Sequence, residues 1–259
     1  MLRKRIIFTL IYSDGFFMQS RNFRLQKVGN LNWLEKNYKF QSIAFSLDEL
    51  IVINATKTVK SISEFASTVS KLVNDVFIPI AAGGGIRSFE DAELLFNSGA
   101  DKIVLNTALV ESPELIKLLV KQYGSQSIVA SIDYKKGNDD FEVFINDGTE
   151  KIDMTLPEYL KYIESLEVGE IYLNSIDKDG TGFGYDFETI KNLQDDINLP
   201  LIIAGGAGNE NHLIDGLYLN NVSAVATANL FNFIGDGLPN AREKIIETGL
   251  NIANWNAVT

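Results

Sequence analysis

One pattern of residues occurs twice in this chain, about 122 residues apart. The first copy contains a glycine-rich turn at 82–85, a helical segment and an apolar run at 101–108. The second contains a glycine-rich turn at 204–208, a helical segment and an apolar run at 223–229. The repeat predicts one domain covering 1–259, built from two half-units of about 1–122 and 123–259.

Short β-rich runs alternate with amphipathic helical segments along the whole chain, which predicts a parallel sheet. Eight such units in about 250 residues favour a closed (β/α)8 TIM barrel over an open doubly wound sheet. The expected strands are 5–11, 49–54, 78–82, 102–106, 128–133, 170–174, 201–204 and 224–228. The expected helices are 31–44, 60–73, 88–98, 112–122, 156–165, 186–195, 209–219 and 240–249.

A β-hairpin is expected at 141–152, after the fifth strand, because Asn146-Asp147-Gly148 is a strong turn sequence. An insertion at this point would lie over the catalytic end of the barrel.

Charge and composition exclude several classes of partner. The 259 residues carry 34 acidic and 23 basic side chains, a net charge of -11, which disfavours nucleic acid and membrane surfaces. No apolar run is long enough to span a bilayer, and 1–8 lacks the features of a signal peptide. With no cysteine and a single histidine, His212, no metal and no cofactor are expected. We expect a soluble, cytoplasmic protein.

Each glycine-rich turn follows an expected strand and precedes an expected helix. Main-chain N–H groups and the helix dipole then converge on a point suited to a phosphate. One glycine turn has an equal structural explanation, but two copies on the third and seventh strands predict two phosphate sites facing each other across the barrel mouth. The strands that follow end in Asn106-Thr107 and Ala228-Asn229, which would complete the two sites.

Asp133 is the best candidate for catalysis, because it closes the fifth strand and shares an inward face with Val129 and Ser131. A carboxylate there can act as a general acid or base, or simply cap the next turn. At the equivalent position of the first half stands Ile11, so the aspartate faces an alkyl group. Asp177 and Asp179, beyond the sixth strand, either orient substrate or form turns.

Four charged residues open strands at the other end of the barrel and share the inward parity of their strands. Buried without partners they would be costly, so we expect a neutral ring of ion pairs. The four residues are Arg5, Glu49, Lys102 and Glu170. Spacing alone assigns them a role in stability.

The sequence resembles the HisF family, the cyclase subunit of imidazole glycerol phosphate synthase, over essentially its whole length. The motifs that carry the resemblance are Lys4-Arg5-Ile6-Ile7, Asp14-Gly15, Asn22-Phe23, Asp48-Glu49-Leu50, Gly83-Gly84-Gly85-Ile86, Gly99-Ala100-Asp101-Lys102, Asn106-Thr107-Ala108, Gly124-Ser125-Gln126, Ile132-Asp133, Gly169-Glu170-Ile171, Ser175-Ile176-Asp177, Asp179-Gly180-Thr181, Gly184-Tyr185-Asp186 and Gly205-Gly206-Ala207-Gly208.

The resemblance implies a lyase and cyclase subunit of a glutamine amidotransferase complex. A HisH-like glutaminase would dock on the N-terminal barrel face, and its ammonia would pass a charged gate and react at the top with a ribulosyl-aminoimidazole-carboxamide nucleotide that carries two phosphates. The implied gate is Arg5, Glu49, Lys102 and Glu170. The implied phosphate-site residues are Gly85, Asn106, Thr107, Asp179, Gly180, Gly206, Ala228 and Asn229.

Three positions depart from the family pattern. The family uses two opposed aspartates, and here Ile11 replaces the first, which removes a group worth about 10² to 10⁴ in rate. Gln19 stands where a lysine usually follows in the mobile first loop, and Asn54 stands where the second strand usually ends in aspartate.

These departures lead to three hypotheses. The leading one is a divergent member that keeps the ammonia conduit and the glutaminase-docking face but delivers ammonia to another acceptor, as in paralogues linked to amidation of surface-polysaccharide sugars. The second is the ordinary cyclase of histidine biosynthesis. The third is a non-catalytic phosphosugar-binding activator of a glutaminase.

Overall fold

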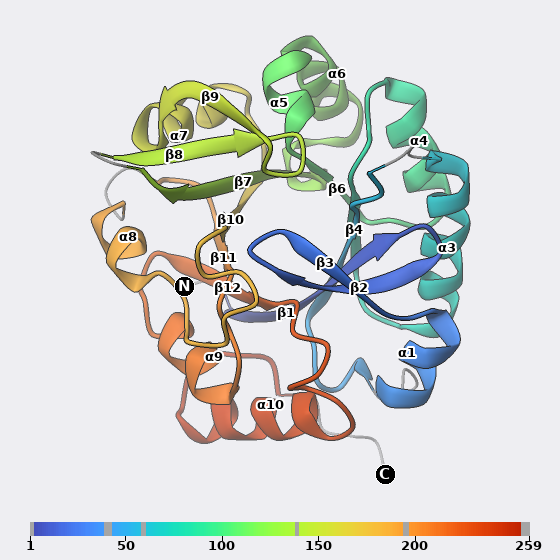
Figure 1. The fold of residues 1–259 in the computed structure, drawn as a ribbon, viewed down its shortest axis with the longest axis vertical. Coiled ribbons are helices and arrows are strands. Elements are labelled where there is room, and N and C mark those ends of the chain that lie inside the picture. The colour runs from blue at the N-terminus through green and yellow to red at the C-terminus, as the bar shows by residue number, and fades with distance from the viewer. Residues whose placement is uncertain (1–2, 39–42, 58–60, 138–139, 194–196, 255–259) are drawn as a thin grey trace.

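The computed structural model describes residues 3–38, 43–57, 61–137, 140–193 and 197–254. Within these residues, parallel strands form a closed eight-strand barrel (Figure 1). In barrel order they are β1 (Arg5–Ser13), β4 (Glu49–Asn54), β5 (Ile80–Gly83), β6 (Lys102–Leu105), β7 (Ile128–Lys136), β10 (Glu170–Ser175), β11 (Leu201–Ala204) and β12 (Val222–Thr227). The barrel closes because β1 pairs in parallel with both β4 and β12, while β7 pairs with β10. The predicted (β/α)8 fold is confirmed.

Helices cover the outside of the barrel (Figure 1). They are α1 (Leu31–Tyr38), α3 (Ile62–Asp75), α4 (Phe89–Asn97), α5 (Thr107–Glu111), α6 (Pro113–Tyr123), α7 (Leu156–Ser165), α8 (Phe187–Asn192), α9 (Glu210–Leu217) and α10 (Gly237–Glu247). Each predicted helix has a counterpart, although positions 39–42, 60 and 194–195 of the predicted ranges lie outside the described residues. None of the described helices is both long and apolar enough to cross a membrane.

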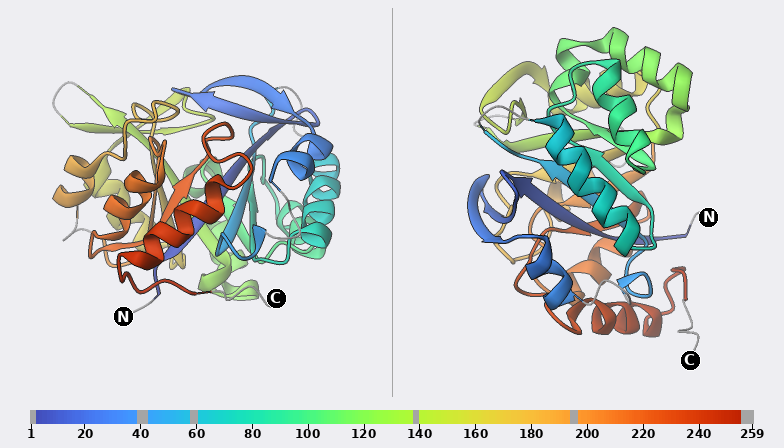
Figure 2. Two further views of the ribbon diagram at one scale, coloured as in Figure 1. Left: turned by 90° about the horizontal axis from the view of Figure 1, so that it is seen from below. Right: turned by 90° about the vertical axis from the view of Figure 1, so that its right-hand side faces the viewer.

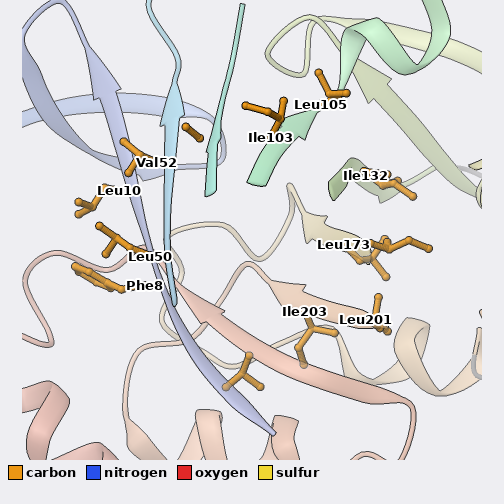
Figure 3. Close-up of a cluster of buried hydrophobic side chains, with 14 of the residues drawn as sticks. Phe8, Leu10, Leu50, Val52, Ile103, Leu105, Ile132, Leu173, Leu201 and Ile203 are labelled. Carbon is orange, nitrogen blue, oxygen red and sulfur yellow. The ribbon is translucent and has the colours of Figure 1, made fainter. Parts of the chain in front are cut away.

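Alternation along the strands separates two apolar clusters. The larger lies between strands and helices, where one face of each strand packs outward, for example Phe8 and Leu10 of β1 and Leu50 and Val52 of β4 (Figure 3). The smaller fills the barrel interior from the opposite strand faces. Its buried members are Ile7, Ile51, Ala81, Val104, Val129, Tyr172, Ile202, Ala204, Ala224 and Ala226.

Two β-hairpins lie at the carboxyl end of the parallel strands (Figure 2). The predicted one comprises β8 (Phe141–Ile145) and β9 (Glu150–Thr155), and β7 continues past the predicted end at 133 to pair antiparallel with β8. The other comprises β2 (Phe16–Arg21) and β3 (Arg24–Gly29) and pairs with the end of β1. The sequence did not predict this second hairpin, which forms where the resemblance implied a mobile loop.

Candidate active site

A cavity of about 400 Å³ opens at the carboxyl ends of the barrel strands. Residues of both hairpins, including Gln19, Phe23 and Asn146, contribute to its wall. Asp133 and all the residues that the resemblance assigns to the phosphate sites line this cavity. These residues are Asp133, Gly85, Asn106, Thr107, Asp179, Gly180, Gly206, Ala228 and Asn229.

Asp133 lies buried in the cavity wall between two side-chain amides. Asn174 Nδ2 donates to Asp133 Oδ1 at 2.9 Å, and Asn106 Nδ2 donates to Oδ2 at 3.3 Å. Burial raises the pKa of Asp133 to about 7, with smaller contributions from Asp147 and Asp179, although the Asn174 hydrogen bond opposes the rise. The carboxyl group can therefore both donate and accept a proton near neutral pH.

Ile11 lies across the cavity from Asp133. β1 and β7 are four strands apart in an eight-strand barrel, so the ends of these strands are diametrically opposite. Ile53 of β4 lines the same side as Ile11. Asn54, also in the wall, uses its Oδ1 to accept a hydrogen bond from Thr56 N at 3.2 Å. The side facing Asp133 is therefore apolar where the resemblance expects a second carboxylate.

The two glycine-rich turns have the same unusual backbone. Gly84 and Gly85 have φ of 94° and 83°, and Gly205 and Gly206 have φ of 87° and 107°, in the region that favours glycine. They follow β5 and β11, which are also four strands apart, so the turns face each other across the mouth. A Cβ on Gly84 would lie 2.2 Å from the Asn54 carbonyl oxygen. Packing thus requires glycine here, whatever the turn binds.

Several predicted phosphate-site side chains are bound to the protein itself. Asn106 Nδ2 donates to Ser131 O at 3.0 Å, Thr107 Oγ1 accepts from Asn146 N at 3.1 Å, and Asn229 Oδ1 accepts from Asn232 N at 3.0 Å. These residues shape the wall. A phosphate at the two turns would be held chiefly by main-chain N–H groups.

Asp179 holds the β2–β3 hairpin over the cavity. Its carboxylate accepts hydrogen bonds from Ser20 Oγ and from Phe23 N, the latter at 3.0 Å, and its carbonyl oxygen accepts from Asn22 N at 3.0 Å. A Cβ on Gly180 would lie 2.2 Å from Ser20 O, so this glycine permits the close approach of the hairpin. In this structure Asp179 and Gly180 act on the hairpin.

Gln19 makes a second attachment of the same hairpin. Its Oε1 accepts a hydrogen bond from Leu230 N at 2.8 Å, in the segment that follows β12. A lysine has three donors and no acceptor, so it cannot make this contact. The departure at position 19 therefore exchanges a cation for a hydrogen-bond acceptor that fixes the hairpin.

Three further charged residues lie in or near the cavity rim. Asp177 is exposed outside the cavity wall, where its carboxylate accepts from Lys136 N at 2.8 Å. Lys57 and Arg87 line the cavity and were not identified from the sequence. Both follow strand ends within four residues, which was an available signal, and they supply positive charge for an anionic ligand.

The predicted ring of ion pairs is present at the other end of the barrel. Arg5 contacts Glu49 at 2.8 Å and also pairs with Glu170, and Lys102 contacts Glu49 at 2.9 Å and Glu170 at 3.0 Å. The two carboxylate side chains are 3% and 7% exposed. Burial raises the pKa of Glu49, while attraction to Lys102 and Arg5 opposes this rise. Each cation bridges both acids, so the ring is neutral and closed.

Comparison with known proteins gives a consistent result. Residues 22–235 match the histidine biosynthesis protein family. Over 256 residues the chain is 44% identical to a Parasynechococcus marenigrum protein provisionally named imidazole glycerol phosphate synthase subunit hisF2, covering 98% of this chain and 95% of that protein.

Two further relatives are named imidazole glycerol phosphate synthase subunit HisF. The Pyrobaculum aerophilum protein is 38% identical over 239 residues, covering 92% of each chain. The Pelodictyon phaeoclathratiforme protein is 34% identical over 253 residues, covering 97% of this chain and 99% of the relative. The chain therefore belongs to the histidine biosynthesis protein family, as a member of its HisF group.

Proposed function

We propose that this chain is the synthase subunit of a glutamine amidotransferase complex that receives ammonia from a HisH-like glutaminase and delivers it to a phosphorylated acceptor other than the histidine-pathway nucleotide. One contrast carries the proposal: the ring of Arg5, Glu49, Lys102 and Glu170 is complete, whereas the cavity has Ile11 opposite Asp133. The charged end of the barrel is kept, and the opposed pair of aspartates is not.

The ring has features suited to a small polar molecule. Its formal charges sum to zero, so the ring carries no net charge that would retain an ion of either sign. Among the described residues, Glu49 Oε1 is buried without a hydrogen-bond partner, although the Oε2 atom of the same group contacts both cations. A buried acceptor without a partner is costly, and a molecule with N–H donors, such as ammonia, would satisfy it.

The N-terminal face around the ring presents aromatic side chains to solvent. Phe45 precedes β4 and is 42% exposed, and Phe77 precedes β5 and is 79% exposed. Large exposed aromatic residues favour a protein interface. They support docking of the glutaminase on this face, next to the entrance that the ring closes.

The acceptor is proposed to be a sugar with phosphate groups, amidated in a surface-polysaccharide pathway. Opposed glycine turns support a ligand with a phosphate at each end, and Lys57 and Arg87 add positive charge at the cavity. The similarity to a relative named hisF2 fits a divergent paralogue of HisF. Asp133, with a pKa of about 7, would move a proton in the acceptor reaction.

The runner-up is the histidine-pathway cyclase itself, supported by the retained Asp133 and by the names of the relatives. The two functions differ in a turnover assay. We expect the purified chain with excess ammonium not to convert the ribulosyl-aminoimidazole-carboxamide nucleotide. A rate within about tenfold of that of the Pyrobaculum aerophilum HisF protein, assayed alongside, would establish the cyclase and overturn the proposed acceptor.

The conduit is tested separately, in a complex reconstituted with the glutaminase. Lys102→Ala opens one side of the ring and should change the ratio of glutamine hydrolysed to ammonia transferred. The matched control is Lys117→Ala, which removes an exposed lysine whose ion pair with Glu114 lies on the outer surface of α6. Equal ratios for the wild type and both variants would argue against passage through the ring.

A further inference from the structure

Between the charged ring and the cavity, one aromatic side chain crosses the barrel interior. Tyr172 extends from β10, is 6% exposed, and places its Oη 3.1 Å from Thr9 Oγ1 on β1. β11 and β12 separate these two strands, so the contact spans the interior and does not join neighbours. Both hydroxyl groups belong to buried residues, and either can be the donor.

The position of this contact along the barrel axis follows from the strand sequences. Tyr172 is two residues beyond Glu170 on β10, and Thr9 is four residues beyond Arg5 on β1. At about 3.3 Å per residue, both lie above the ring toward the carboxyl end. Tyr172 and Thr9 also line the cavity. A molecule that travels along the axis from ring to cavity must therefore pass the phenol.

The surroundings of the hydroxyl pair are apolar. Ile7, Ile51 and Val129 fill the interior beside Tyr172, and alanines supply the small positions. Burial raises the pKa of Tyr172, so the phenol stays neutral. The charges that act on the phenol are the carboxyl groups of Asp133 and Asp179, which lie in the cavity wall above it. A cation leaving the ring would lose its counter-charge, whereas a small neutral molecule with donors and an acceptor could replace the hydroxyl contact.

We propose that Tyr172 and Thr9 form a second constriction, held by their hydroxyl contact, that admits a small neutral molecule and excludes ions between the ring and the cavity. Its role in ammonia transfer rests on the proposed function, whereas its existence does not. Opening requires the loss of one buried hydrogen bond, which the two hydroxyl groups exchange for hydrogen bonds to the passing molecule. The aromatic ring of Tyr172 fills the passage while the contact is made.

The absence of cysteine from the sequence permits a direct test with single thiol reporters. Ile7→Cys places a thiol on β1 between Arg5 and Thr9, beneath the constriction, and Lys57→Cys places one at the exposed rim of the cavity. The probe is methyl methanethiosulfonate, a small uncharged reagent. We expect the Ile7→Cys thiol to react at least about tenfold more slowly than the Lys57→Cys thiol, because the constriction must open first.

Adding Tyr172→Phe removes the hydroxyl but keeps the ring, and should speed modification of the Ile7→Cys thiol by about threefold to tenfold, the value of one hydrogen bond. Thr9→Val, of similar shape, should have the same effect, and neither should alter the Lys57→Cys rate. Unchanged rates in both double variants, or equal rates for the two reporters, would overturn the proposal. Val129→Cys, at the level of Glu170 on the neighbouring strand, replaces Ile7→Cys if that variant does not fold.

The outcome is independent of the proposed function. If the thiol rates behave as expected while Lys102→Ala leaves coupling unchanged, the constriction stands and the conduit fails. If Lys102→Ala changes the ratio of glutamine hydrolysed to ammonia transferred but Tyr172→Phe leaves the thiol rates unchanged, the conduit is supported and the second constriction is not.

Discussion

The two ends of the barrel treat charge in opposite ways. At the N-terminal end, two acids and two bases form a closed neutral ring in which each cation contacts both carboxylates. At the C-terminal end, Asp133 is held by two asparagine amides and faces Ile11. At the N-terminal end the buried charges balance, whereas at the C-terminal end the pKa of the buried carboxyl group lies near neutral pH.

The difference shows which parts of such a barrel can change separately. Removing one ring member leaves a buried partner charge uncompensated, so we expect a single substitution in the ring to be costly. In the cavity, an isoleucine opposite the aspartate leaves no unpaired charge, and the site can adopt another ligand at little cost in stability. We therefore expect single substitutions at the cavity to cost less stability than single substitutions in the ring.

The largest expected effect comes from giving the cavity a second carboxylate opposite Asp133. Ile11→Asp restores a carboxylate opposite Asp133 and should raise turnover of the histidine-pathway nucleotide with ammonium by about 10² or more, the usual contribution of a general acid or base. Ile11→Asn, of the same size but unable to titrate in this range, is the matched control. Equal turnover by the two variants would show that the missing aspartate does not limit cyclase activity.

The buried Asp133 predicts a pH-dependent stability. Its pKa is raised from 3.8 to about 7, so between these values the folded state holds a proton that the unfolded state has released. The contribution of Asp133 to the free energy of unfolding is therefore largest below about pH 4, and it is lost as the pH rises through 7. The pKa difference corresponds to at most about 4 kcal/mol.

Urea unfolding of the wild type and of Asp133→Asn, measured from pH 4 to 8, isolates this contribution. The free energy of unfolding of the wild type minus that of Asp133→Asn should decrease as the pH rises across this range. A difference that stays constant with pH would contradict the raised pKa.

The ring predicts a loss of stability when its balance is broken. Glu49→Ala removes the shared partner of Arg5 and Lys102 and should lower the free energy of unfolding by about 3 kcal/mol, because two partly buried cations then compete for Glu170. Lys117→Ala, at an exposed ion pair, should leave the urea midpoint unchanged. An equally small effect at Glu49 would mean that the ring contributes nothing to the fold.

Much of the fold was predictable because local signals agree with the global structure. The strand–helix alternation and the paired glycine turns predicted the barrel, and Asn146-Asp147-Gly148 predicted the β8–β9 hairpin. The β2–β3 hairpin lacked such a signal. Its turn residues Asn22 and Phe23 have φ of 49° and 60°, a conformation usually supplied by Asn-Gly. Tertiary hydrogen bonds donated by Asn22 N and Phe23 N to Asp179 hold this turn, and sequence spacing does not reveal them.

The candidate site was predictable in its positions and less so in its contacts. Period-two alternation placed Asp133 and the four ring residues correctly, because a strand fixes which way alternate side chains point. It did not show that Asn106 and Asn174 bind Asp133, since those partners come from other strands. Roles that depend on side-chain contacts between distant segments require the structure.

The smallest expected effect concerns the hydrogen bond between Gln19 and the segment that follows β12. Gln19 Oε1 accepts from Leu230 N at 2.8 Å, and this contact, with those of Asp179, holds the β2–β3 hairpin over the site. Gln19→Lys removes the acceptor and should speed hydrogen exchange of the Leu230 amide by about fivefold, the effect of one hydrogen bond. Gln19→Glu keeps an acceptor and should preserve the protection. If Gln19→Lys exchanges as slowly as the wild type, the Gln19 contact does not hold the hairpin, and the hydrogen bonds to Asp179 and the pairing with β1 hold it without Gln19.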